Sequence, residues 1–235
     1  MRRTLIAIAA MVVATPLAAQ QQQGNDKDPT IAAKGGGALP AGWSIALDPK
    51  EIAKSATPAM VKFVTMGDGY HFTTGPAAIY YRAKDVTSGA YQVTATFHQT
   101  KKNVGHGDHG EAYGLVVGGS NLDSPDAQYL YFIVRQDGSY MIRHRAGPDD
   151  KTQLHTIVQW TESPAVNKVA ADGSTTNTLL IHCAGDSIHF LANGKLLQGF
   201  SKAGLHGMFP EGVAGIRMNH NLDVHVSGFK VEEIK

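Results

Sequence analysis

Short runs in which apolar and polar residues alternate recur along this chain, and they constrain its fold more than any other feature. In residues 129–135, Leu130, Phe132 and Val134 alternate with Tyr129, Tyr131 and Arg135. Successive side chains of a strand point to opposite faces, so this pattern predicts a strand with one apolar face. The next residues, Gln136-Asp137-Gly138, predict a hairpin turn before a second alternating run at 140–145.

Alternating runs bounded by turn signals return in two further segments. Residues 91–98 alternate, and residues 177–197 carry turn signals at Gly185-Asp186 and Asn193-Gly194. Only residues 49–56 have a helical pattern. Charged residues make up 17% of the chain and Gly numbers 26, a composition that suits many turns between short strands. The expected fold class is all-β, a sandwich of two antiparallel sheets.

Residues 215–233 (GIRMNHNLDVHVSGFKVEE) concentrate metal-binding and catalytic residue types in a few positions. Residues 213–218 and 222–226 are predicted to be partner strands, with Asn219, His220 and Asn221 at the turn between them. Asp223 and His225 then share the polar face of the second strand. On this interpretation the cluster is mainly the exposed side of a hairpin.

The N-terminal residues have the pattern of an export signal. Arg2 and Arg3 precede an apolar run at 4–13, and Leu17-Ala18-Ala19 offers a small-residue cleavage site. We therefore expect a signal peptide at 1–19, a flexible Gln- and Gly-containing linker at 20–40, and a single domain at 41–235. The expected location is periplasmic or secreted, with no membrane association after cleavage.

Two compositional features narrow the chemistry. The net charge is +1 and no basic stripe is present, so nucleic-acid binding is not expected. The only cysteine, Cys183, lies in an apolar alternating run and is predicted to be a buried, inert thiol.

Residues 177–197 (NTLLIHCAGDSIHFLANGKLL) and 212–231 (GVAGIRMNHNLDVHVSGFKV) carry a family likeness. This succession resembles the closing strands of the concanavalin A-like lectin/glucanase superfamily. It is most similar to the laminin G-like branch and to a domain of unknown function labelled 3-keto-disaccharide hydrolase. The resemblance covers about residues 41–235. It implies a jelly-roll β-sandwich with a concave sheet and a glycan or small sugar as ligand.

The resemblance leaves three functions open. The leading one is carbohydrate binding on the concave sheet. A second is hydrolysis of a glycoside or 3-keto sugar, with Glu111 as general acid or base and His98 or a bound metal assisting. Endoglucanases of this fold use a Glu-x-Asp-x-(x)-Glu triplet, which this chain lacks. A third is a laminin G-like protein-interaction module, which would need a flat face with an exposed apolar patch.

Strand parity predicts which side chains gather opposite the apolar core. Aromatic rings can stack on sugars, and Arg and Glu can hydrogen-bond hydroxyls or a carboxylate. The predicted ligand-binding and catalytic set comprises His98, Glu111, Tyr113, Tyr131, Arg135, Arg143 and Arg145. The arginines favour an anionic or keto-bearing ligand, and the alternative interpretation is a solvated sheet with cross-strand ion pairs.

The segment HGDHGE (106–111) is the densest in metal-ligand types. His106, Asp108 and His109 could supply nitrogen and oxygen ligands to a divalent ion such as zinc or calcium. The spacing matches no recognised metal motif, so a polar loop before a strand is the alternative.

Overall fold

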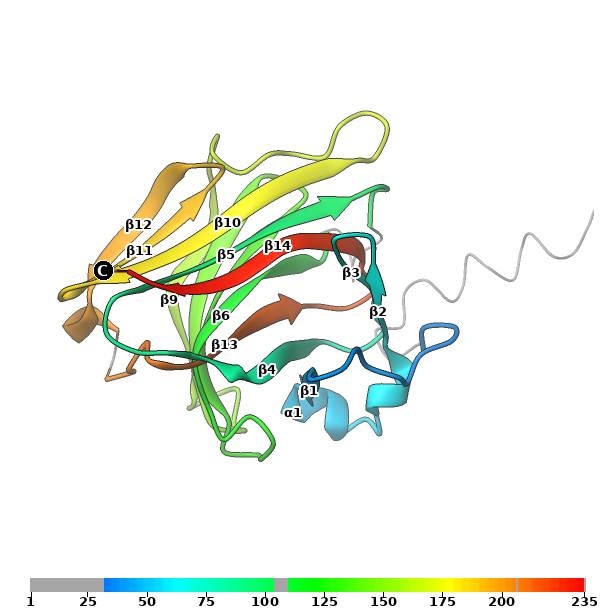
Figure 1. Ribbon diagram of the computed structural model, residues 1–235, viewed down its shortest axis with the longest axis horizontal. Helices are drawn as coiled ribbons and strands as arrows, with labels where there is room; N and C mark the ends of the chain where they lie inside the picture. The colour runs from blue at the N-terminus through cyan, green and yellow to red at the C-terminus, as the bar shows by residue number, and fades with distance from the viewer. Residues whose placement is uncertain (1–31, 104–109, 206, 235) are drawn as a thin grey trace, which may run out of the picture.

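The computed structural model describes residues 32–103, 110–205 and 207–234 as two antiparallel sheets packed face to face (Figure 1). Sheet A has the order β1 (Ser44–Leu47), β4 (Ala78–Thr87), β13 (Gly212–Met218), β6 (Ala112–Ser120), β7 (Gln128–Arg135), β8 (Ser139–Ala146), β9 (Leu154–Glu162). Sheet B has the order β12 (Lys195–Ser201), β11 (Ser187–Ala192), β10 (Thr175–Ala184), β5 (Tyr91–Gln99), β14 (Asp223–Glu233), β3 (Gly69–Thr73), β2 (Lys62–Met66). The predicted all-β jelly-roll sandwich is confirmed.

Short helical turns connect some of these strands. They are α1 (Pro49–Ile52) and the 3-10 turns η2 (Pro58–Met60) and η3 (Lys202–Gly204). The helix α1 lies within the segment predicted to be helical. No helix within the described ranges is long and apolar enough to cross a membrane.

The main core lies between the sheets and follows the predicted alternation. From β7 it takes Leu130, Phe132 and Val134, and the intervening side chains face the outside of sheet A. Trp43 also belongs to this core, where its ring meets Phe63 edge-on. Cys183 is buried as predicted, and burial raises the pKa of its thiol.

The expected hairpin between 213–218 and 222–226 is wrong. β13 pairs with β4 and β6 in sheet A, whereas β14 pairs with β3 and β5 in sheet B. The chain between them, residues 219–222, therefore crosses from one sheet to the other. Alternation identifies strands and their faces, but it does not say which strands become hydrogen-bonded neighbours.

The outer faces of the two sheets differ in character. On sheet B, polar side chains such as Thr96, His98 and Thr178 face solvent. On sheet A, a second apolar cluster lies on the outer face and includes Val116, Ile133 and Met141, all nearly fully buried. Side chains and loops above sheet A must cover these residues, so its outer face is a recessed surface rather than a flat one.

The segment before the first strand lies against the sandwich. The backbone N–H of Ala33 donates to the carbonyl of Met60, and that of Gly37 donates to Val61. These contacts fall within the C-terminal half of the expected linker. The expected signal peptide lies outside the described residues and stays a prediction.

Candidate ligand-binding face

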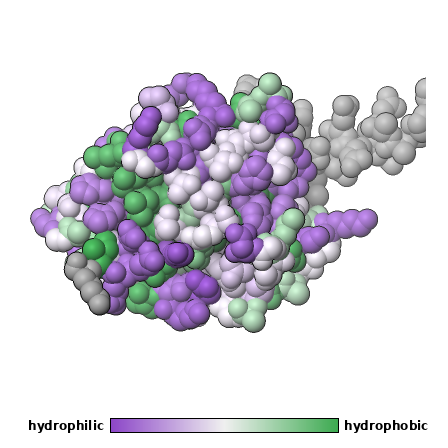
Figure 2. Space-filling view, turned by 45° about the horizontal axis from the view of Figure 1, so that its top comes forward, coloured by the Kyte–Doolittle hydropathy of each residue, from purple (hydrophilic) through white to green (hydrophobic). Residues whose placement is uncertain are grey.

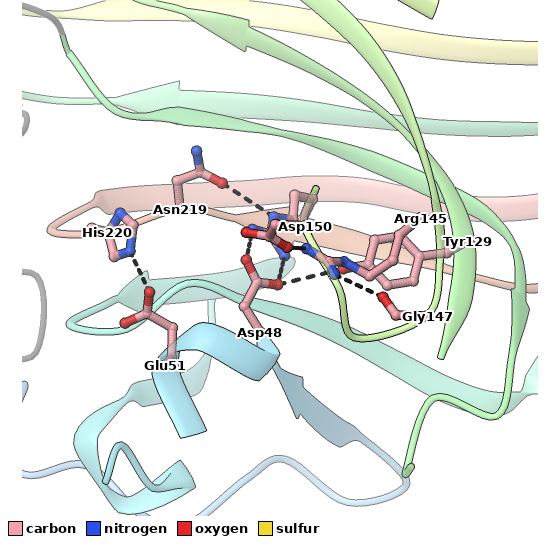
Figure 3. A network of polar contacts seen from close by, with 9 residues as sticks. Asp48, Glu51, Tyr129, Arg145, Gly147, Asp150, Asn219 and His220 are labelled. Carbon is pink, nitrogen blue, oxygen red and sulfur yellow. Dashed lines mark hydrogen bonds and ion pairs between the residues drawn. The ribbon is translucent and has the colours of Figure 1, made fainter. Parts of the chain in front are cut away.

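A buried ion pair organises the outer face of sheet A near α1 (Figure 3). Arg217 of β13 donates through Nη1 to Asp48 Oδ1 at 2.5 Å and through Nη2 to Oδ2 at 2.6 Å. Burial alone would raise the pKa of Asp48, but the Arg217 guanidinium outweighs burial and holds this pKa at about 2. Both groups are therefore charged at neutral pH.

The pair is extended by neighbouring polar groups. Tyr129 of β7 points its hydroxyl at Asp48 Oδ1, with 3.4 Å between the oxygens. Arg217 Nε donates to Asn219 Oδ1 at 3.1 Å. The two oxygens of Asp48 thus receive donors from two strands of sheet A, which ties the residue preceding α1 to the sheet.

Arg145 of β8 is a second buried guanidinium on this face. Its Nη1 donates to the Gly147 carbonyl at 2.9 Å, and its Nη2 donates to Asp150 at 2.5 Å (Figure 3). Its buried Nε has no hydrogen-bond partner within the described parts of the chain. Arg145 is thus charge-balanced, and its remaining Nε donor is buried.

Arg143 and Arg135 differ from these two arginines because neither has an ion pair among the described residues. Arg143 lies beside Tyr131 in the β7–β8 register. The Arg135 guanidinium carbon lies 3.5 Å from the centre of the Trp160 ring, a close cation–π contact. Both arginines are partly exposed, and the buried Nε of each has no partner. Two guanidinium groups without a direct ion pair to a described residue are therefore partly exposed here, although the charges of Asp137 and Glu111 act on Arg135.

Trp160 of β9 lies on the outer face of sheet A, away from the core between the sheets. It packs against the outer apolar cluster of sheet A and is partly exposed. The Trp160 ring stacks against the planar guanidinium group of Arg135. The N–H groups at the edge of that plane are the polar part of the contact.

A histidine lies between two glutamates beside this face. His220 Nε2 is 2.9 Å from Glu51 Oε1, and Nδ1 is 3.5 Å from Glu111 Oε2. Glu51 and Glu111 are buried, and the His220 side chain is 13% exposed. Burial alone would lower the pKa of His220, but the hydrogen bonds and charges of Glu111 and Glu51 raise it overall. The imidazole is thus held toward its protonated form.

Two residues of the predicted set lie elsewhere, so their assignment to this face is wrong. Tyr113 points into the core between the sheets, where its hydroxyl accepts a hydrogen bond from Asn177 Nδ2 at 3.2 Å. His98 lies on the outer face of sheet B, opposite His225 of β14. The alternation within a strand shows only which side chains point away from the apolar core. It does not show which outer face they reach, because each of the two sheets has its own.

The other predicted residues are brought together on one sheet. Tyr131, Arg135, Arg143 and Arg145 come from the adjacent strands β7 and β8, and Glu111 directly precedes β6, which pairs with β7. Asp48, Glu51 and Arg217 were not predicted from the sequence. The alternation of Arg217 with apolar residues in β13 could have predicted that its side chain faces away from the core. Asp48 and Glu51 lack such a pattern, because only the fold brings them close to the strands.

The polar residues of 215–233 divide between two surfaces. Asn219 and His220 join the face of sheet A, whereas Asp223 and His225 lie on the outer face of sheet B. There Asp223 bridges His71 at 3.0 Å and Lys101 at 2.9 Å. The cluster in the sequence is therefore not one site.

The predicted metal ligands His106, Asp108 and His109 lie outside the described residues. In the part of the chain that the structure does describe, no group of three or more His, Cys, Asp or Glu side chains is arranged to hold a metal ion. The zinc or calcium site stays a prediction.

Comparison with known proteins supports the fold. No family model matches the chain, and no curated protein sequence matches it. Among solved structures, the carbohydrate-binding module CBM66 from Bacillus subtilis is similar, with a TM-score of 0.54 and 9% identity over 82% of this chain and 96% of the module. A Bacillus subtilis protein of unknown function with a galectin-like fold gives a TM-score of 0.54 and 12% identity over 81% of this chain and 89% of its own.

A third similar structure is a candidate glycosyl hydrolase from Parabacteroides distasonis ATCC 8503. Its TM-score is 0.51, with 12% identity over 83% of this chain and 89% of that chain. Together these likenesses show the fold of the chain, a jelly-roll β-sandwich of the kind found in carbohydrate-binding modules and galectin-like proteins. They do not test the resemblance to the laminin G-like or 3-keto-disaccharide hydrolase branches.

The Asp48–Arg217 pair is expected to be important for stability. Asp48→Asn leaves a buried guanidinium without its counter-charge, and we expect the free energy of unfolding to fall by about 3–5 kcal/mol. Glu162→Gln is the matched control, because Glu162 pairs with Lys168 on the exposed surface and its loss should cost less than about 1 kcal/mol. Urea unfolding measures both, and equal effects would contradict this role for the buried pair.

His220 is expected to make stability depend on pH in a defined direction. Its folded pKa is raised above the ordinary value of 6.5, so its contribution is complete below about pH 6.5 and is lost as pH rises through the folded pKa. The difference in unfolding free energy between wild type and His220→Gln should therefore be larger at pH 6 than at pH 9. A difference that is constant or grows with pH would show that the imidazole is not held protonated by the glutamates.

Proposed function

We propose that this protein binds carbohydrate on the outer face of sheet A. The observation that carries the proposal is a pair of partly exposed guanidinium groups, Arg143 and Arg135, that have no ion pair to a described residue and lie on one face with Trp160. Such a group can bind a carboxylate or hydroxyl of a ligand without first giving up a salt bridge. The shared fold with a carbohydrate-binding module supports the same function.

The chemistry of this face favours an acidic sugar. A guanidinium presents a planar fork of N–H donors that matches a carboxylate or a pair of hydroxyl oxygens. The stack on Trp160 restrains Arg135, which reduces the side-chain entropy lost when a ligand is bound. Tyr131 lies beside Arg143 and is nearly fully buried, and burial raises the pKa of its hydroxyl, so the residue stays neutral next to the arginines.

The N-terminal pattern of residues 1–19 supports export, with a periplasmic or secreted location.

A laminin G-like interaction module is less well supported. On the face seen in Figure 2, green apolar side chains gather mainly toward the left and are interrupted by polar ones, so this face does not present the continuous apolar patch that such a module would need.

If a sugar binds on this face, removing one of its arginines should weaken sugar binding. On a glycan array probed with the chain from Gln20, we expect acidic glycans to bind, and Arg143→Ala to weaken the best of them about 10- to 100-fold by calorimetry. His98→Ala, on the outer face of sheet B, is the control and should bind like wild type. Equal affinity of wild type and Arg143→Ala would exclude this face. Repeating the array with a chelator tests the predicted metal site at His106, Asp108 and His109.

A second candidate function is hydrolysis of a glycoside or keto sugar, favoured by the Glu51–His220–Glu111 arrangement. Glycoside cleavage uses one carboxyl group as acid and another as base or nucleophile. Here two glutamates share one histidine next to the proposed sugar face. Glu111 would be the acid or base, and His220 would hold its orientation and charge.

The hydrolase candidate predicts a separation of binding from turnover. With a panel of 4-nitrophenyl glycosides as substrates, Glu111→Gln should lower kcat at least about 100-fold and leave glycan affinity nearly unchanged. Glu162→Gln, on the exposed surface, should retain full turnover. Turnover that survives Glu111→Gln would remove Glu111 from the reaction.

A further inference from the structure

An apolar pocket of about 580 Å³ adjoins the arginine-bearing face. One wall is the segment from β1 through α1 to η2, including Leu47, Ile52 and Ala53, and the opposite wall is the loop after β6, including Leu122. Ile79 and Tyr129 on the outer face of sheet A complete it. The volume lies within the range of about 300–1,000 Å³ that small-molecule sites occupy.

The pocket is continuous with the proposed sugar face through two tyrosines. Tyr129 lines the pocket, and its ring centre is 5.7 Å from that of Tyr131, which lies beside Arg143. Arg145 also lines the pocket, and its Nε is buried without a partner among the described residues. One end of the pocket therefore meets the guanidinium group of Arg145, whereas most of the other lining residues are apolar.

The charges define how a ligand would lie. Asp123, an exposed carboxylate, also lines the pocket and would repel an anionic group. Arg143, two residues from Arg145 on β8 and without an ion pair to a described residue, would attract it. A ligand with an anionic part and an apolar part would thus place its anion on the arginines and its apolar part among Ile79, Leu47 and Leu122.

We infer that the ligand is a glycoside of an acidic sugar carrying an apolar aglycone, with the sugar on the Arg143 face and the aglycone in the pocket. This inference rests on the proposed function, since it specifies the ligand of that same face. Each methylene group transferred from water into an apolar site strengthens binding about fourfold. An alkyl chain that is only partly buried would therefore raise affinity well beyond that of the sugar alone.

The test compares two probes that differ only in the aglycone, octyl β-D-glucuronide and methyl β-D-glucuronide, by calorimetry below the micelle-forming concentration. We expect the octyl glycoside to bind at least tenfold more tightly. Ala53→Trp should remove this gain by filling the pocket and leave the methyl glycoside unaffected. Ala59→Trp is the matched control, because Ala59 is also exposed on this segment but does not line the pocket.

The outcomes separate this inference from the proposed function. Equal affinity for the two glycosides would overturn the inference and leave sugar binding on the arginine face intact. Octanoate binding as tightly as octyl glucuronide would overturn it too, because the sugar would then contribute nothing. Binding of neither glycoside also overturns it, and the glycan array then decides separately whether another sugar occupies the face.

Discussion

The buried pair of Asp48 and Arg217 is the interaction on which the rest of this face depends. Asp48 immediately precedes α1, and Arg217 lies 169 positions later on β13, so one bidentate contact fixes the α1 segment against sheet A. That attachment brings Glu51 to His220 and sets one wall of the apolar pocket. The low pKa of Asp48 reflects the strength of this contact. The attraction between the carboxylate and Arg217 outweighs the cost of removing the carboxylate from water.

The four arginines on the outer face of sheet A serve two different purposes. Arg217 and Arg145 are buried and matched to Asp48 and Asp150, so they hold the chain in place. Arg143 and Arg135 are unmatched among the described residues and partly exposed, so their charge is directed outward. In the proposed binding site, these anchoring pairs would hold the neighbouring arginines in place before a ligand arrives, which would lower the cost of ordering them.

Much of the local structure could be predicted from particular residues. Asp137-Gly138 and Asn193-Gly194 marked true turns, and the alternation of Leu130, Phe132 and Val134 identified the core face of β7. The grouping of Tyr131 with Arg143 followed from the same parity. The predictions failed where partners had to be chosen: β13 and β14 joined different sheets, and His98 and Tyr113 were assigned to a face that they do not share.

The sequence by itself determined the strands, their turns and the side of each strand that is apolar, because these depend on neighbours within a few residues. Only the tertiary structure decided which outer face is recessed and which polar groups meet there. Asp48 with Arg217, and His220 with Glu51 and Glu111, are separated by more than 100 positions in the chain. Their contacts arise from strand order and from the packing of the α1 segment on sheet A, and no local pattern encodes either.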